Sequence, residues 1–202
     1  MPSWFDFVTV EARTVLLAAG VTARHDGRTE ISADDVALAL LGERDGAATT
    51  VWHRLGVDRD RLVERLRPRG TYRPGAPVVR LDATARALWE RARRTALLTG
   101  ADRVGTRHLL LALVDDGPAA VVVAFTEAGV TRVAARAVLD RVPEIERLPA
   151  RLGPVRRWRW RWARWRLRWD RLRRAVRRRP ALVVALLALV AAVTVATLRY
   201  AS

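Results

Sequence analysis

Apolar residues recur at three- and four-residue steps in two stretches of the chain, one near the N-terminus and one nearer its middle. They occupy positions 12, 15, 16, 19 and 23 in the first stretch and 85, 88, 89, 92 and 96 in the second. Side chains at this spacing lie on one face of a helix. The pattern therefore predicts a long amphipathic helix in each stretch.

These two helices belong to an internal repeat, because sliding the chain against itself by 73 residues aligns the apolar positions without a gap. The same offset brings Ile31 onto Val104 and Leu40 onto Leu113. One offset that holds this far indicates tandem copies, about residues 5–67 and 78–142. The segment 67–77 between them, RPRGTYRPGAP, is rich in Pro and Gly and is expected to be a linker.

Each copy is expected to hold four helices. A second helix should begin near Ser32, with Asp35 in its first turn, and near Thr106 in the other copy, with Ser32 and Thr106 as N-cap residues. Two shorter helices should follow, separated at Gly56 and Gly129, where a residue that tolerates positive φ ends one helix. No strand pattern is present, so the sequence predicts an all-α fold of two tandem four-helix repeats that form one helical bundle.

The core of this bundle follows from the same periodicity. We expect a charged residue at several of its positions to unfold the domain. The predicted core positions are Val15, Leu16, Ala19, Val36, Leu40, Leu88, Trp89, Ala92, Leu109 and Leu113.

A transmembrane helix is predicted over residues 180–198, beyond a linker at 143–155. Its uncharged part, Ala181 to Leu198, is broken only by two threonines and would extend roughly 27 Å as a helix, close to the thickness of a bilayer core. A buried core helix is the alternative, although arginines at 177–179 immediately precede the segment. They place the preceding chain on the cytoplasmic side, and the N-terminus resembles no secretory signal. We therefore expect a single-pass protein of the inner (cytoplasmic) membrane with its N-terminal domain in the cytoplasm.

The segment 156–179 carries 13 Arg and five Trp, and its apolar residues follow steps of four and three. As a helix it would be amphipathic and would lie along the headgroups, with arginines against anionic membrane lipids. Nucleic-acid binding is the second interpretation of this segment, and a coiled-coil seam is the third. The predicted membrane-interface residues are Trp158, Trp162, Trp165, Trp169, Leu172 and Val176.

Charge and composition exclude several classes of function for this chain. Residues 1–150 hold 22 arginines against 20 acidic side chains, a net of +2, whereas residues 151–202 hold 15 against Asp170 alone, a net of +14. The chain has neither cysteine nor lysine, which excludes thiolate chemistry and a P-loop, whose lysine reaches the nucleotide phosphates. No catalytic motif is present. We expect no enzymatic activity, no metal or cofactor, and no small-molecule substrate.

The paired segments ISADDVALALL and VGTRHLLLALV, each after an Ala-Arg helix and before a Gly-Val step, resemble the double repeat at the N-terminus of Clp-type AAA+ unfoldases. The resemblance covers roughly residues 5–142, without the ATPase modules, and His108 is the family's usual histidine, where the first copy has Asp35. It implies a helical bundle that recruits adaptors and substrates and in some members binds phosphorylated arginine at the acid before that histidine. Asp34 occupies this acid's place, and Arg107 reverses its charge in the second copy.

The resemblance thus gives Asp34, Asp35, Arg107 and His108 as candidate peptide- or adaptor-binding residues. Asp34 equally fits a first-turn acid that the helix dipole favours. The leading hypothesis is a non-catalytic, membrane-tethered module whose protein partner is a Clp-type substrate, adaptor or unfoldase. The alternatives are a structural scaffold without recognition and a basic effector that binds nucleic acid or anionic lipid through residues 156–179.

Overall fold

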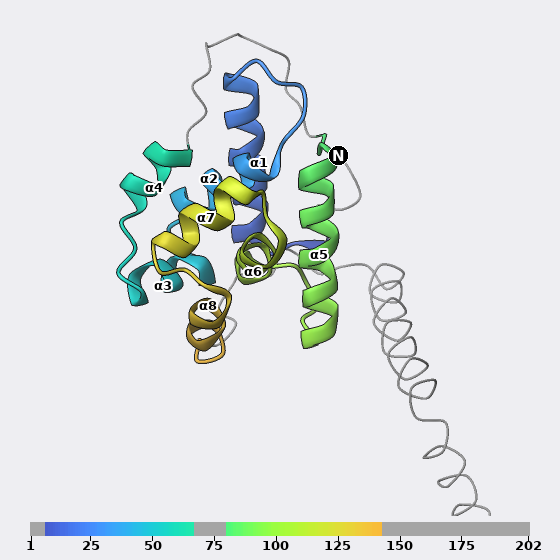
Figure 1. Ribbon diagram of the computed structural model, residues 1–202. Coiled ribbons are helices and arrows are strands. Elements are labelled where there is room, and N and C mark those ends of the chain that lie inside the picture. Colours follow the sequence, from blue (N-terminus) through green and yellow to red (C-terminus); the bar gives the residue numbers. More distant parts are fainter. Residues whose placement is uncertain (1–6, 67–79, 143–202) are drawn as a thin grey trace, which may run out of the picture. The chain divides into compact units, whose positions relative to one another are not determined.

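Helices form wherever the apolar periodicity predicts them. The computed structural model describes residues 7–66 and 80–142, and its helices are coloured in chain order in Figure 1. The first copy holds α1 (Val10–His25), α2 (Ala33–Gly42), α3 (Ala47–Arg54) and α4 (Arg59–Leu66). The second holds α5 (Ala83–Thr99), α6 (Thr106–Asp116), α7 (Ala119–Glu127) and α8 (Arg132–Leu139). The all-α, four-helix organisation of each copy is confirmed for this part of the chain.

Several helices begin at a polar cap, whereas α3, α6 and α7 follow Gly46, Gly105 and Pro118, which make no side-chain cap hydrogen bond. The Thr9 side chain accepts from the backbone N–H of Ala12 at the start of α1, and Asp82 caps α5 in the equivalent way. Ser32 caps α2 as predicted. The prediction for Thr106 is wrong, because this residue is the first of α6 and the cap is Gly105. The Thr106 hydroxyl instead lies 3.3 Å from the backbone nitrogen of Ala48 and accepts its hydrogen bond.

Gly56 and Gly129 separate the short helices, as predicted. Their φ angles are +64° and +81°, in the left-handed region that glycine enters without steric cost. Each glycine lets the following valine donate its N–H back to an aromatic residue, Val57 to Trp52 at 2.9 Å and Val130 to Phe125 at 2.8 Å. The two turns are therefore the same structure in both copies.

The short segment that precedes the first helix of each copy pairs with the backbone of the other copy. Val8, just before α1, forms a parallel bridge with Val104 of the second copy, and Ile31 of the first copy forms the equivalent bridge with Leu81. In each case the two backbones share a pair of hydrogen bonds of 2.7 to 3.0 Å. These isolated bridges are the extended pairings among residues 7–66 and 80–142. Each copy therefore makes backbone hydrogen bonds to the other through the segment before its first helix.

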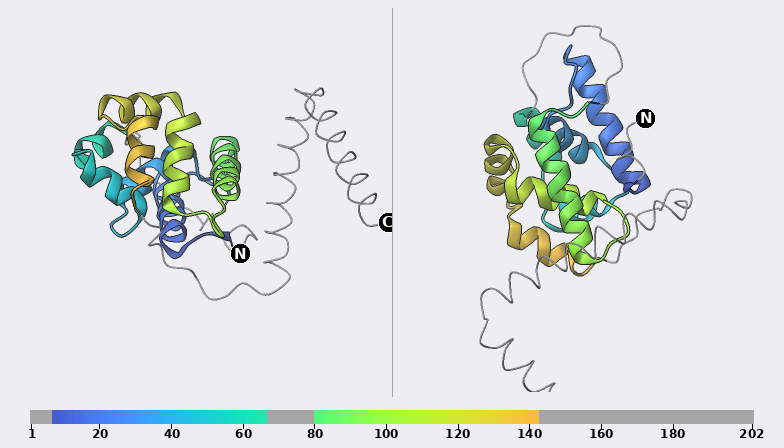
Figure 2. Two further views of the ribbon diagram at one scale, coloured as in Figure 1. Left: turned by 90° about the horizontal axis from the view of Figure 1, so that it is seen from below. Right: turned by 90° about the vertical axis from the view of Figure 1, so that its right-hand side faces the viewer.

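The core lies between the copies. In Figure 2 (left), α6 runs between α8 and α5. All ten predicted core positions are buried, with exposed fractions from 0% to 7%. Trp52 and Phe125, which are equivalent at the offset of 73, meet edge to face with ring centroids 5.5 Å apart. The repeat therefore places one aromatic ring from each copy against the other at the centre of the bundle.

The described residues belong to a compact unit that extends over Met1–Arg156. Among the described helices, none alone has the length and apolarity of a membrane span; α6 and α7 reach them only when taken together, and they are bent by 102° at their break. The predicted transmembrane helix at 180–198 lies outside the described residues. So do the linker at 143–155 and the Trp/Arg segment at 156–179, and these predictions stay predictions.

Candidate functional site

The four candidate site residues lie in the first turns of two equivalent helices. Asp34 and Asp35 begin α2 in the first copy, and Arg107 and His108 begin α6 in the second. Of these, Asp35 and His108 are buried, with 0% and 2% of their surface exposed. Asp34 and Arg107 are half-buried and so reach solvent. A partner could contact these two without any rearrangement of the domain.

In the first copy, Asp35 holds the start of α2. Its carboxylate accepts from the Ser32 backbone N–H at 2.8 Å, while the Ser32 hydroxyl accepts from the Asp35 N–H at 3.3 Å, which completes a capping box. The guanidinium of Arg28 grips the same carboxylate with two hydrogen bonds of 2.6 Å and reaches Asp26 at 2.8 Å. The Asp35 hydrogen bond is the largest cause of the raised pKa of Arg28. The paired, bidentate geometry compensates for burying this charge.

Asp34 sits beside this pair in a carboxylate-rich environment. Burial, and then the charge of Asp35, raise the pKa of Asp34 above its ordinary value, with a smaller contribution from Asp82 at the start of α5. Thr84 joins the two helix starts, because its hydroxyl donates to Asp82 at 2.7 Å and accepts from the Ala33 N–H at 3.1 Å. The Asp34 carboxylate is therefore part of a junction between the two copies.

In the second copy, a neutral imidazole replaces the carboxylate. The Gly105 N–H donates to Nδ1 of His108 at 2.9 Å, so the ring proton lies on Nε2, which is 3.5 Å from the Thr99 hydroxyl. Burial, and then the charge of Arg107, lower the pKa of His108 to about 3. Protonation would also place a hydrogen on Nδ1, so that this N–H would face the N–H of Gly105. His108 therefore accepts the N–H of the cap residue at the start of α6, as Asp35 does at the start of α2, but its ring carries no charge.

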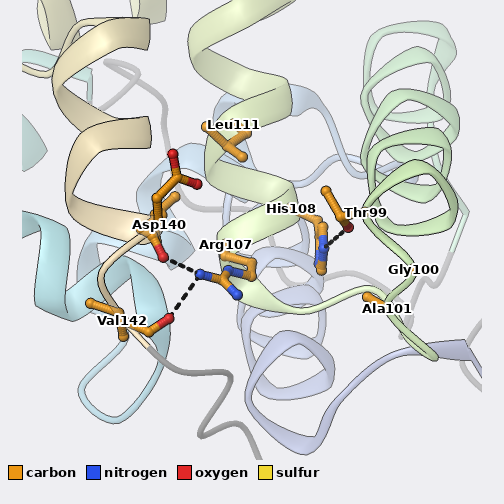
Figure 3. Close-up of a pocket in the computed structure, with 9 residues that line it drawn as sticks. Thr99, Gly100, Ala101, Arg107, His108, Leu111, Asp140 and Val142 are labelled. Atoms are coloured by element: carbon orange, nitrogen blue, oxygen red, sulfur yellow. Dashed lines mark hydrogen bonds between the residues drawn. The ribbon is translucent and has the colours of Figure 1, made fainter.

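Arg107 ties the start of α6 to the end of α8. Its guanidinium donates to the carbonyl of Leu139 and, at 3.1 Å, to the carbonyl of Val142, as Figure 3 shows. The Leu139 carbonyl lies in the last turn of α8, where a helix carries partial negative charge and lacks intrahelical partners, and the Val142 carbonyl lies three residues beyond that turn. Arg107, the counterpart of Asp34 in the second copy, is therefore engaged in a structural contact.

A pocket of about 370 Å³ opens beside these groups. Figure 3 shows it between the end of α5, the start of α6 and the segment after α8. At the 73-residue offset, its lining residues Thr99, Ala101 and His108 are the counterparts of Asp26, Arg28 and Asp35. In the first copy, Arg28 and its two carboxylates therefore fill the equivalent place. The second copy has a short alanine there, and the pocket stays open.

Sequence reasoning did not identify Arg28, Thr99 or Ala101 as part of the site. A signal was present, because Arg28 and Asp35 both change at the offset, to Ala101 and His108. A buried carboxylate needs a compensating cation, so loss of the cation goes with loss of the carboxylate. This paired difference marks the two places as chemically different sites on equivalent backbones.

Comparison with known proteins shows which family the chain belongs to. Residues 8–122 match the model of the Clp repeat (R) N-terminal domain. Among curated proteins, the chain is similar to the ATP-dependent Clp protease ATP-binding subunit ClpA homolog of Guillardia theta, with 32% identity over 118 residues. The match covers 56% of this chain and 14% of that relative, so the chain spans only a small part of the relative's length.

Solved structures share the fold. The N-domain of ClpV from Vibrio cholerae superposes with a TM-score of 0.58 at 12% identity, over 71% of this chain and 91% of that one. The Hsp104 N-terminal domain from Candida albicans superposes with a TM-score of 0.54 at 18% identity, over 67% and 90%. The family match covers more than half of the chain, and the helices, their order and the repeat agree with it. The chain belongs to the Clp repeat N-terminal domain family.

Proposed function

We propose that this protein is a non-catalytic protein-binding module that is held at a membrane by its C-terminal region. The Clp repeat N-terminal domain is a binding domain without catalytic function, and its homologues in Clp chaperones bind substrates and adaptors. The observation that carries the proposal here is the open pocket of the second copy. Its volume falls within the range of ordinary ligand sites.

The partner is a protein, either a Clp-type substrate, an adaptor or an unfoldase. The pocket is lined by apolar groups such as Leu111 and Leu139 next to the polar groups of Thr99 and Arg107. A recess lined by both apolar and polar groups can take a side chain of a bound peptide, and the polar groups would fix its orientation. In the first copy the equivalent place holds Arg28, whose guanidinium is bound to the Asp35 carboxylate. The second copy is therefore the principal contact.

Filling the pocket should abolish partner capture. Ala101→Leu places a larger apolar side chain in the recess, so we expect full-length protein with this change to lose the partners that the unchanged protein captures after cross-linking in intact cells. The matched control is Arg61→Ala, which alters a second pocket of about 340 Å³ next to α4 and α7. Capture that persists in Ala101→Leu, or that is lost equally in Arg61→Ala, would contradict a role for this pocket. Circular dichroism of both variants checks their folding.

Membrane tethering makes a separate prediction. The uncharged stretch Ala181 to Leu198 and the arginines before it support this part of the proposal. We expect the full chain to stay with membranes through washes with high salt and with alkaline carbonate, and a chain that ends at Arg179 to be released. If both proteins wash off, the C-terminal stretch is not an anchor. A basic protein that binds nucleic acid would then be the better interpretation of residues 156–179.

A further inference from the structure

The outer face of α1 carries an apolar stripe that the fold does not cover. Five large apolar side chains are exposed in the described part of the chain, and three of them are Val10, Leu17 and Val21 of this helix, with 37%, 42% and 55% of their surface exposed. At 100° per residue, these positions fall within about 40° of one another around the helix axis. They form one line on the side away from the buried face of α1.

The internal repeat shows that the fold itself does not require this stripe. The equivalent positions of α5 are Ala83, Glu90 and Arg94, which are small or charged and are exposed. The same helix in the same architecture thus tolerates a polar outer face. An exposed apolar line that one copy has and the other lacks indicates a surface with a partner of its own.

The charges along α1 indicate the class of that partner. On the helical wheel, Arg13 and Arg24 both fall along one edge of the stripe, three turns apart. The helix has one acidic side chain, Glu11, and it is 5% exposed. An apolar stripe with an arginine border and no exposed acid is the pattern of a helix that lies in the headgroup region of an anionic membrane.

We propose that the outer face of α1 docks on an anionic lipid surface, with Val10, Leu17 and Val21 in the headgroup boundary and arginines at its edge. The inference rests on the proposed membrane tether, which would keep the domain close to the bilayer. The segment 143–155 can extend to about 45 Å, while a domain of this size has a radius of gyration of about 14 Å. A tether of that length lets any face reach the membrane, and the stripe selects this one.

A second copy of the chain fits the stripe less well. The helix is about 24 Å long, and pairing two stripes about 10 Å wide would bury roughly 500 Å² in total, well under the 1,200 Å² or so of a stable interface. An antiparallel, two-fold pairing of the stripes would also bring the arginine edges of both copies together. A lipid surface has neither restriction.

The chain has no cysteine, so a single introduced cysteine can be labelled without background. We would label full-length Leu17→Cys with an environment-sensitive dye and add phosphatidylcholine vesicles that contain phosphatidylglycerol. The matched control is Glu90→Cys, the equivalent position of α5. We expect a blue shift and quenching by brominated lipids at position 17, and neither at position 90. Adding Val10→Ser and Val21→Ser, both at exposed positions, should reduce the signal at 17.

Flotation of the same samples separates this proposal from the tether. If the full chain floats with vesicles but the dye at position 17 is not quenched, the docking proposal is wrong and the tether stands. If the chain does not float, the tether is wrong, and quenching in the vesicle suspension still decides the docking: a quenched dye retains it and an unquenched dye overturns it. A blue shift that grows with protein concentration without lipid quenching would overturn it in favour of self-association.

Discussion

Trp52→Ala is expected to lower the free energy of unfolding by about 3 to 5 kcal/mol. Trp52 is 1% exposed, its indole N–H donates to the Leu40 carbonyl at 3.3 Å, and its ring meets Phe125 edge to face. Alanine would leave a cavity at the contact of the two copies, and the Leu40 carbonyl would keep only its hydrogen bond from the Glu43 N–H. Since a domain of this size is stable by about 5 to 15 kcal/mol in total, the variant should be close to unfolding.

Urea denaturation followed by far-ultraviolet circular dichroism measures this loss without relying on the other tryptophans. Val133→Ala is the control, because Val133 is 78% exposed and its truncation should change stability by no more than about 0.5 kcal/mol. A loss under about 1 kcal/mol in Trp52→Ala would contradict the central position of this ring. Phe125→Ala and the double variant complete a cycle, and we expect them to be non-additive because the two rings touch.

The helices and core could be predicted from the sequence because both follow from local periodicity. The positions of Val15, Leu40 and Leu109 needed only a three- or four-residue pattern, and the repeat supplied the same pattern twice. Ser32 was identified as a cap because a cap and its helix are neighbours in sequence. The same local reasoning gave the wrong cap for α6, because Thr106 lies one residue after the actual cap, Gly105. The hydroxyl there serves Ala48 of another helix, a contact that no local pattern reveals.

The chemistry of the candidate site was less predictable because it depends on contacts between distant segments. Arg107 donates to carbonyls more than thirty residues away in the chain, so its charge was interpreted without its partner. The pocket exists because Ala101 is short where the first copy has Arg28, and that contrast has a meaning only once Arg28 is seen to fill its own site. Comparing the two copies position by position would have revealed the difference, although not the cavity.

His108 makes the stability of the protein depend on pH. Its pKa in the folded protein is about 3, against an ordinary value of 6.5 for an unfolded chain. Between these values the unfolded state binds more protons than the folded state, so the stability contributed by the neutral ring is fully present above about pH 6.5 and is lost as the pH falls towards 3. At 1.36 kcal/mol per unit, this one group should remove about 3 kcal/mol between about pH 7 and pH 4.

His108→Asn isolates this effect, since an asparagine side-chain oxygen can accept the Gly105 N–H but acquires no charge. We expect the variant to be less stable than the unchanged protein near neutral pH, where the imidazole packs, and to lose less stability on acidification. The quantity to compare is the slope of the unfolding free energy against pH, from urea melts of the full chain. Val133→Ala, at an exposed position without an ionisable group, should leave that slope unchanged. Equal slopes in His108→Asn and the unchanged protein would mean that the ring takes up its proton at the same pH in the folded and in the unfolded chain, so that the fold does not keep it neutral. In acid the α6 start would then carry a charge, as the α2 start does at Asp35, and the pocket beside it would become a cationic site.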